Sequence, residues 1–157
     1  YCDAVKGAMA RLRQAGAACK KALLLIQAPP SKLAAGYEEW FSASVLQALQ
    51  EVHDPLEARE FLPADKLNQV TALSFAALAG EELCGGPTAA SPEVASLLAA
   101  LETGRRLARD LGGADPERMS PPNCAHALQQ YFAPLAPRLG VEVIADQAVL
   151  QREYPLL

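Results

Sequence analysis

Hydrophobic residues recur along this chain in two spacings, one typical of amphipathic helices and one of buried strands. Val5, Met9 and Leu12 lie three or four positions apart and predict a helix over residues 4–17. The continuous apolar run at residues 22–26 instead predicts a strand buried on both faces. The helical spacing also predicts helices over residues 31–52, 92–111 and 123–132 and between Asp146 and Pro155. Further strands are predicted over residues 70–75 and 141–144.

Glycines, prolines and capping residues separate these elements. Gly16 can end the first helix, and Ser91 followed by proline can begin the long helix that Gly112 and Gly113 stop. Three polar stretches are expected to form surface connections or irregular loops: residues 53–60, 80–91 and 115–122. Interior strands that alternate with helices predict an α/β fold with largely parallel strands.

Composition and charge narrow the classes of partner. Half of the 157 residues are apolar, 20% are charged, and the mean hydropathy is close to neutral, as in soluble globular proteins. The net charge is −4, and basic residues are scattered except for the pairs at 20–21 and 105–106, which we interpret as solvated helix faces. The longest apolar runs are far too short to span a bilayer. We therefore expect neither nucleic acid nor membrane as a partner.

The cysteines favour a reducing intracellular compartment such as the cytoplasm. Cys2, Cys19, Cys84 and Cys124 are widely separated and form no Cys-x-x-Cys pair. Cys124 and His126 could supply two metal ligands, but a closed zinc site needs four, and neither Cys84 nor His53 has a sequence relation to them. We interpret Cys124 as a packing residue on a helix and expect no metal there.

Motifs for common enzyme chemistry are also missing. Residues 27–30 follow the first strand with prolines and not with the Gly-x-Gly-x-x-Gly of dinucleotide-binding proteins. Residues 80–86 lack the Lys-Ser/Thr of a phosphate-binding loop. His53 and His126 are interpreted as ordinary surface or helix histidines and not as members of a catalytic triad.

The acidic residues Asp54, Glu57 and Glu60 form the nearest approach to a carboxylate cluster. They fall in the stretch that we expect to be a connector, so we interpret them as a solvated acidic turn and not as ligands of a catalytic metal. The sequence therefore indicates no catalytic, cofactor-binding or metal-binding residue within the chain.

Three short motifs in the second half of the chain resemble the interdomain region of leucyl aminopeptidases. They are Gly-Arg-Arg-Leu-Ala-Arg-Asp-Leu at 104–111, the proline-containing segment 115–121, and Leu-Gly-Val-Glu-Val-Ile at 139–144, in that order. Residues 4–77 are similar in layout to the second half of that family's N-terminal α/β domain. Residues 112–114 depart from the family's small polar, Asn-containing turn.

The resemblance implies an α/β fold, a hexamer, and a site with two zinc or manganese ions that removes N-terminal residues from peptides. The family's Asn-Thr-Asp-Ala-Glu-Gly-Arg signature, which supplies metal ligands, does not occur in residues 1–157. We therefore expect residues 1–91 to be the remainder of an N-terminal domain, residues 92–122 a linker helix and hinge loop, and residues 123–157 the first strand and helix of a catalytic-type domain.

On this interpretation the chain is a non-catalytic segment whose partners are its own catalytic domain and further copies in a homo-oligomer. The alternative is a catalytically inactive, aminopeptidase-derived component of a larger protein assembly. The residues of the chain do not separate these two readings, because the positions that would decide between them are not among residues 1–157.

Overall fold

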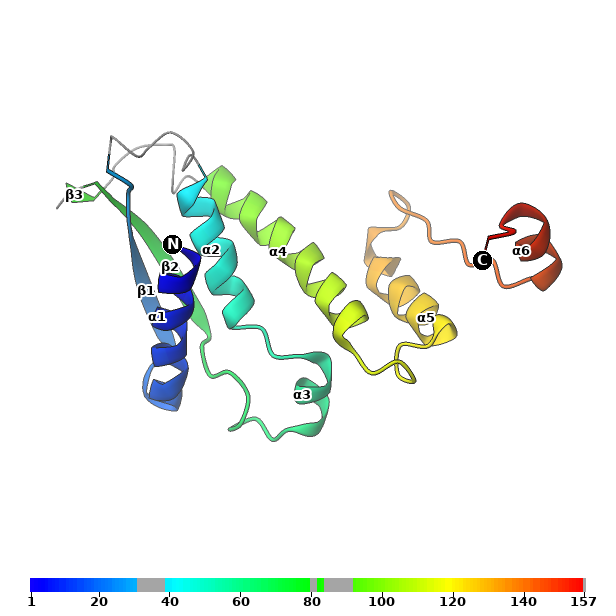
Figure 1. Ribbon diagram of the computed structural model, residues 1–157, viewed down its shortest axis with the longest axis horizontal. Coiled ribbons are helices and arrows are strands. Elements are labelled where there is room, and N and C mark those ends of the chain that lie inside the picture. Colours follow the sequence, from blue (N-terminus) through cyan, green and yellow to red (C-terminus); the bar gives the residue numbers. More distant parts are fainter. Residues whose placement is uncertain (31–38, 80–81, 84–91, 157) are drawn as a thin grey trace. The chain divides into compact units, whose positions relative to one another are not determined.

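The computed structural model describes residues 1–30, 39–79, 82–83 and 92–156, and it divides into two compact units, Tyr1–Gly113 and Ala114–Leu157 (Figure 1). The elements of the first unit are α1 (Cys2–Ala15), η1 (Gly16–Ala18), β1 (Lys21–Gln27), α2 (Trp40–Glu51), α3 (Leu56–Phe61), β2 (Ala72–Ala79), β3 (Glu82–Leu83) and α4 (Pro92–Gly113). Those of the second unit are α5 (Pro121–Phe132), η3 (Ala133–Leu135) and α6 (Gln147–Glu153). The division expected from the sequence, at residues 91 and 122, stays a prediction.

The sheet of the first unit is built around a parallel pair of strands. β1 pairs with β2 in parallel, with Leu24 opposite Phe75 and Ile26 opposite Ala77. The chain between them includes α2, as expected because parallel neighbours need a crossover connection. The short β3 pairs antiparallel with the end of β2. The mixed α/β fold with parallel strands that the sequence predicts is confirmed.

Helix α1 ends at the glycine that the sequence indicates. Gly16 has a φ of 55°, in the left-handed region that favours glycine, and its N–H donates to the carbonyl of Arg13. The apolar stripe of α1 turns inward, so that Val5 and Met9 are buried together with Ala48 of α2. The period of the apolar residues therefore predicted the correct face as well as the helix.

The hydrophobic core lies between one face of the sheet and the helices of the first unit. Its main cluster of buried residues comes from β1, β2, α2 and α4: Ile26, Phe41, Val45, Ala77 and Leu98. Ser44 is fully buried in α2, and its hydroxyl donates to the Trp40 carbonyl at 2.7 Å. The core thus joins α4, the long helix, to the sheet and to α2.

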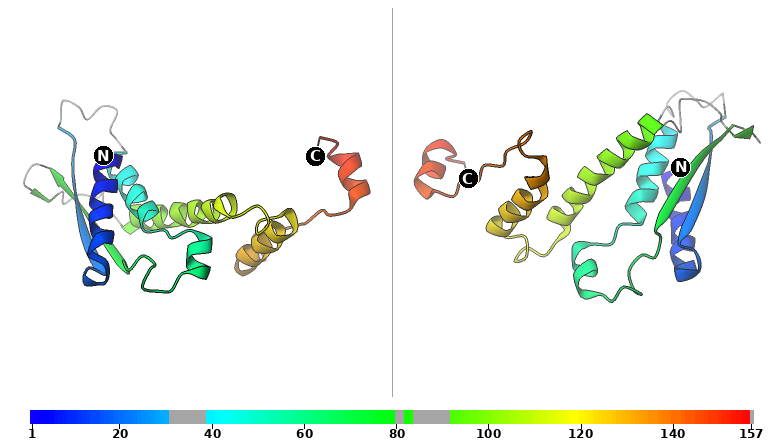
Figure 2. Two further views of the ribbon diagram at one scale, coloured as in Figure 1. Left: turned by 60° about the horizontal axis from the view of Figure 1, so that its bottom comes forward. Right: turned by 180° about the vertical axis from the view of Figure 1, so that it is seen from behind.

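The expectation that β1 is buried on both faces is wrong for the described residues. Leu23 and Leu25, on the face opposite Leu24 and Ile26, are 60% and 56% exposed. Figure 2 shows α1 and α2 on one side of β1 and β2, and its right-hand view shows no described helix over the other side. An apolar run at this position therefore does not by itself reveal which faces of the strand are covered.

Two expected connections contain regular structure. Residues 53–60 were predicted to be a surface connection, but most of them belong to α3, because residues 56–60 are mostly good helix formers and follow Pro55. In the stretch 80–91, Glu82–Leu83 form β3, and the other residues lie outside the described ones. The helix predicted for residues 31–52 is α2, and its expected start also lies outside the described residues.

The second unit contains short helices with clear start signals. Ser120 precedes α5, which has prolines in its first turn, and Asp146 caps α6 by accepting from the N–H groups of Ala148 and Val149 at 2.8 and 3.2 Å. The strand predicted for residues 141–144 is wrong. The described residues of this unit offer it no neighbouring strand for hydrogen bonding, and Val141 and Val143 are exposed.

Candidate functional site

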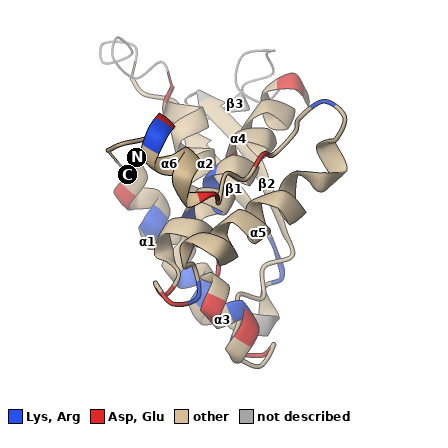
Figure 3. Ribbon diagram, turned by 90° about the vertical axis from the view of Figure 1, so that its right-hand side faces the viewer, with Lys and Arg blue, Asp and Glu red and all other residues tan. Residues whose placement is uncertain are grey.

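Five charged side chains and one histidine lie together where α2, α3 and α4 meet in the first unit. We call this group the junction cluster, and its members are His53, Arg59, Glu102, Arg105, Arg109 and Asp110. The members on α4 lie mostly three, four or seven positions apart, which places them along one side of that helix. Figure 3 shows acidic and basic residues together on α3 as well.

Asp110 is the acidic centre of one half of the junction cluster. Its Oδ1 lies 3.2 Å from His53 Nε2 and 2.6 Å from an Arg59 Nη2. The side chains of His53, Asp110 and Arg59 are only 9%, 18% and 26% exposed. Water screens these contacts less than it would at an open surface, so loss of one partner would leave the others poorly compensated. Asp110 therefore ties α3 and the end of α2 to α4.

Glu102 is the acidic centre of the other half. It forms ion pairs with Arg105, at 3.2 Å, and with Arg109 on the same helix. Arg105 also donates to the Leu46 carbonyl at 3.3 Å and to Gln50 Oε1 at 2.8 Å. These contacts run from α4 to the last turns of α2, so both halves of the cluster join the same pair of helices.

The surroundings of His53 disfavour its protonated form. Burial lowers the pKa of His53 below its usual 6.5, because the imidazolium loses hydration. The negative charge of Asp110 acts in the opposite direction, while Arg109, Arg106 and Arg59 reinforce the lowering of the pKa. The folded protein therefore keeps His53 neutral at a pH where a free histidine would be substantially protonated.

A histidine beside an aspartate makes up two parts of a Ser-His-Asp arrangement, and the third part is a nucleophile beside the histidine. A cavity of about 390 Å³ adjoins the pair, and its lining consists of His53, Pro55, Leu56, Glu57, Arg109, Gly112 and Gly113. No serine, threonine or cysteine is among these residues. The described lining of this cavity offers the pair no nucleophile, and the geometry of the pair is that of a contact that joins helices.

The interpretation of His53 as an ordinary surface or helix histidine is therefore corrected. Its side chain is only 9% exposed, and it pairs with Asp110, a residue 57 positions later in the chain. The spacing of charges on α4 could have indicated a charged helix side. It could not have named His53 and Arg59 as partners, because these contacts form only when α3 packs against α4.

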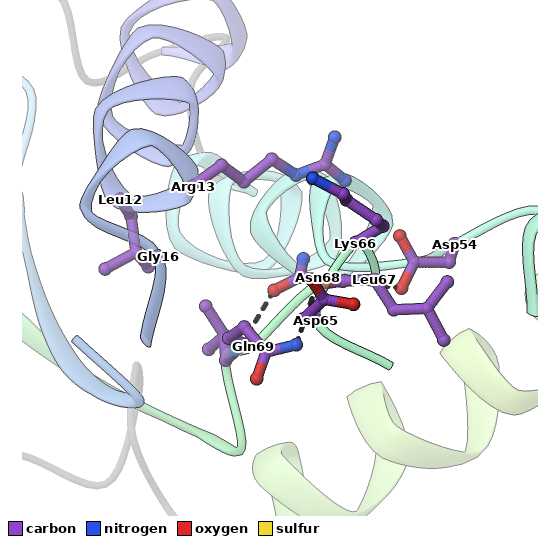
Figure 4. Close-up of a pocket in the computed structure, with 10 residues that line it drawn as sticks. Leu12, Arg13, Gly16, Asp54, Asp65, Lys66, Leu67, Asn68 and Gln69 are labelled. Atoms are coloured by element: carbon purple, nitrogen blue, oxygen red, sulfur yellow. Dashed lines mark hydrogen bonds between the residues drawn. The ribbon is translucent and has the colours of Figure 1, made fainter. Parts of the chain in front are cut away.

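A second polar region is a cavity of about 350 Å³ between the C-terminal end of α1 and residues 65–70 (Figure 4). Asp54 accepts a hydrogen bond from the Asn68 N–H at 2.8 Å, and Asn68 Oδ1 accepts from the Val70 N–H at 2.9 Å. These bonds hold the chain just before β2. The cavity thus lies near the amino ends of β1 and β2, whereas open α/β sheets bind ligands at the carboxyl ends of their strands.

The acidic turn expected at Asp54, Glu57 and Glu60 is also different in the structure. Asp54 is half-buried and hydrogen-bonded to Asn68, whereas Glu57 and Glu60 belong to α3.

Cys124 and His126, the two residues considered as metal ligands, lie on α5. The Cys124 thiol is free and half-buried, and His126 Nε2 lies 2.8 Å from Gln130 Nε2. This agrees with Cys124 as a helix packing residue. Cys84 lies outside the described residues.

The donor chemistry of the described chain does not fit a two-metal centre. In residues 1–30, 39–79, 82–83 and 92–156, no three or more histidine, cysteine, aspartate or glutamate side chains gather in a way that could hold a metal ion. A two-metal site needs several carboxylates around both ions.

In the described part of the chain, none of the helices has the length and apolar character required to cross a membrane.

Comparison with known proteins relates the chain to an aminopeptidase. It is 32% identical, over 137 residues, to a Caenorhabditis elegans protein whose name reads "Putative aminopeptidase". The match covers 87% of this chain and 23% of that protein, so the chain spans about a quarter of the length of its relative. No family model and no solved structure matches the chain. The similarity supports an aminopeptidase-related segment without indicating which aminopeptidase family it comes from.

Proposed function

We propose that the chain is the N-terminal and linker segment of a leucyl-aminopeptidase-like protein. The reaction of the complete protein would be the metal-dependent removal of N-terminal residues from peptides, and this segment would not catalyse it. The observation that carries the proposal is the 32% identity to an aminopeptidase-named protein over 87% of the chain. The short share of that relative, 23%, agrees with a segment that lacks the remainder of the protein.

The positions of the three family-like motifs support a linking role. Residues 104–111 lie in the C-terminal half of α4, residues 115–121 form the turn before α5 and its first residue, and residues 139–144 precede α6. The first motif also contains Arg105, Arg109 and Asp110 of the junction cluster. The end of α4 is thereby held to α2 and α3 immediately before the boundary between the two units.

The chemistry of the described side chains supports the non-catalytic part of the proposal. Peptide hydrolysis needs either an activated nucleophile or a water polarised by metal ions. The His53–Asp110 pair has no hydroxyl or thiol among the residues that line its cavity. The described carboxylates do not form a metal-binding group. These observations support the proposal that catalysis in the complete protein depends on residues other than the described ones.

An assay with leucine amide substrates tests the proposal. The 157-residue chain should show no hydrolysis above the rate without protein, with or without added manganese or zinc. A full-length protein that contains this segment should hydrolyse the same substrate only with metal. Saturable, metal-dependent turnover by the 157-residue chain alone would refute the non-catalytic assignment, and metal-independent activity of the full-length protein would refute the parent reaction.

A second candidate is a catalytically inactive structural component derived from an aminopeptidase. The observation that favours it is the exposed apolar face of β1, where Leu23 and Leu25 are available for contact with other protein surface. The two candidates differ in the full-length protein. If that protein binds no manganese or zinc and fails to hydrolyse leucine amides, it is the catalytically inactive structural component. Metal-dependent turnover by that protein excludes this second candidate.

A further inference from the structure

Helix α3 contributes no buried residue to the core of the first unit. Figure 1 shows it in the connection between α2 and β2, away from the sheet. None of its residues is buried, Phe61 is 74% exposed, and both core clusters form without it. A polar contact joins it to α4, where Arg59 Nη2 lies 2.6 Å from Asp110 Oδ1. Movement of α3 would therefore leave the core intact.

The contact between α3 and α4 is incompletely filled and incompletely hydrogen-bonded. A cavity of about 390 Å³ has Leu56 of α3 and Gly112 and Gly113 of α4 in its lining. Arg59 Nε is buried and has no hydrogen-bond partner among the described residues. A buried donor without a partner costs free energy, which water would recover if α3 moved away from α4. The closed position of α3 is therefore opposed by a cost that opening removes.

His53 lies at the same contact and faces the same carboxylate oxygen. Its Nε2 is 3.2 Å from the Asp110 Oδ1 that also faces Arg59, and its side chain is only 9% exposed. The imidazole lines the 390 Å³ cavity together with Leu56 and Glu57 of α3. Movement of α3 away from α4 would therefore bring His53 into water.

The surroundings of His53 disfavour an added positive charge. The charged groups on the elements around it are Asp110, Arg106 and Arg109 from α4, Arg59 and Glu57 from α3, and Asp54 from the turn before α3. Burial is the main cause that holds the pKa of His53 below its usual 6.5, and the three arginines add to this effect against Asp110. Asp54 is engaged elsewhere, because it accepts the Asn68 N–H.

We propose that α3 is an acid-opened strap: when His53 takes up a proton from the solvent, α3 leaves the end of α4 while the core of the first unit stays folded. In the closed position an imidazolium and the Arg59 guanidinium would share one Asp110 oxygen with little water around them. The open position lets water solvate all three groups. Opening also frees the last turn of α4, immediately before the boundary between the two units. The inference does not rest on the proposed function.

Native-state hydrogen exchange of the 157-residue chain, followed by NMR, tests the strap. The reporters are the N–H groups of Arg59 and Leu62, which donate to the carbonyls of Pro55 and Ala58 at 3.0 Å. The reference is the N–H of Ala48, a buried residue of α2. Protection is expressed relative to an unstructured chain at the same pH. Dilute urea should leave the protection of the two reporters unchanged, because opening a strap exposes little surface, and should lower that of the reference.

The pH dependence of the protection is the second readout. Between about pH 7.5 and about pH 5.5 the protection of Arg59 and Leu62 should fall ~3- to 10-fold. The reason is that an open His53, with its ordinary pKa of 6.5, becomes protonated over this range, whereas the closed one resists protonation. His53→Gln should abolish the fall. His126→Gln, at an exposed histidine, should leave the fall unchanged.

Arg59→Gln tests the strap without changing the histidine. It removes the ion pair with Asp110, so at about pH 7.5 it should lower the protection of Leu62 ~3-fold or more, again without a urea dependence. Arg11→Gln is the matched control, since Arg11 is exposed on α1 and does not belong to the junction cluster. Thermal melting checks that each variant is folded.

Any one of three results contradicts the strap. The first is an equal urea dependence for the two reporters and for Ala48, which would mean that α3 opens only with the whole unit. The second is a fall in protection that is absent from the unchanged chain or is equally large in His53→Gln. The third is equal protection of Leu62 in Arg59→Gln and Arg11→Gln. If His53→Gln does not fold, the urea dependence and Arg59→Gln still decide.

Discussion

His53 and His126 are the two histidines of the chain, and their surroundings are opposite. His53 is 9% exposed and lies between Asp110 and several arginines, whereas His126 is exposed on α5 beside Gln130. At the scale of the residue, burial and neighbouring charge decide the protonation of His53. The sequence shows only that both side chains are imidazoles.

The lowered pKa of His53 predicts a pH-dependent stability. Between its folded pKa and 6.5 the unfolded chain binds more protons at this site than the folded chain. The contribution to the free energy of unfolding is therefore fully present above 6.5 and declines as the pH falls through this window. Urea unfolding across the window should show this decline, and His53→Gln should reduce it.

His126→Gln is the matched control for that experiment, because it removes the other histidine of the chain from an exposed site. It should leave the decline unchanged. A decline that is the same in His53→Gln as in the unchanged chain would show that other groups cause it.

Asp110 provides a second test at this scale. Asp110→Asn removes the negative charge that His53 and Arg59 share, and it should lower the free energy of unfolding at neutral pH by about 2 kcal/mol. Asp3→Asn breaks the ion pair with Lys6 at a fully exposed carboxylate in the first turn of α1 and should have a much smaller effect. Urea unfolding compares the two, and equal effects would contradict a stabilising role for the junction cluster.

At the scale of the element, local signals worked well where they were strong. Gly16 ends α1, and Asp146 caps α6, because glycine conformation and side-chain capping act within a few residues. The strand expected at residues 141–144 failed for the opposite reason. A strand is stabilised by its neighbours, and the described residues of the second unit supply none.

The packing of α1 on α2 gives a prediction about these elements. Met9 is 1% exposed and contacts the cluster with Val5 and Ala48, so Met9→Ala should lower the free energy of unfolding by about 3 kcal/mol. Leu97→Ala, at a residue 59% exposed on α4, should cost much less. Thermal or urea unfolding measures both, and a Met9→Ala effect no larger than that of Leu97→Ala would contradict the described packing.

At the scale of the whole molecule, the two units differ in how much core they contain. Both clusters of buried hydrophobic residues lie in Tyr1–Gly113, and none of the described residues of Ala114–Leu157 is buried. Cooperative unfolding depends on buried apolar surface. The stability of the chain is therefore expected to come from the first unit.

Truncation of the chain tests whether its stability comes from the first unit. Residues 1–113 alone should keep a cooperative thermal transition close to that of the 157-residue chain, since both core clusters are retained. Residues 114–157 alone should show no cooperative transition. Circular dichroism measures the transition. Its loss in residues 1–113 would mean that the second unit contributes to the core.

The sequence by itself determined most of the helices, the parallel-strand α/β class and several helix ends, because apolar spacing and capping are properties of nearby residues. It did not determine that one face of β1 is exposed, that His53 pairs with Asp110, or that Arg13 and Lys66 line one cavity. These features join residues far apart in the chain or depend on which surfaces cover one another. Only the packing of α1, α2, α3 and α4 with the sheet decides them.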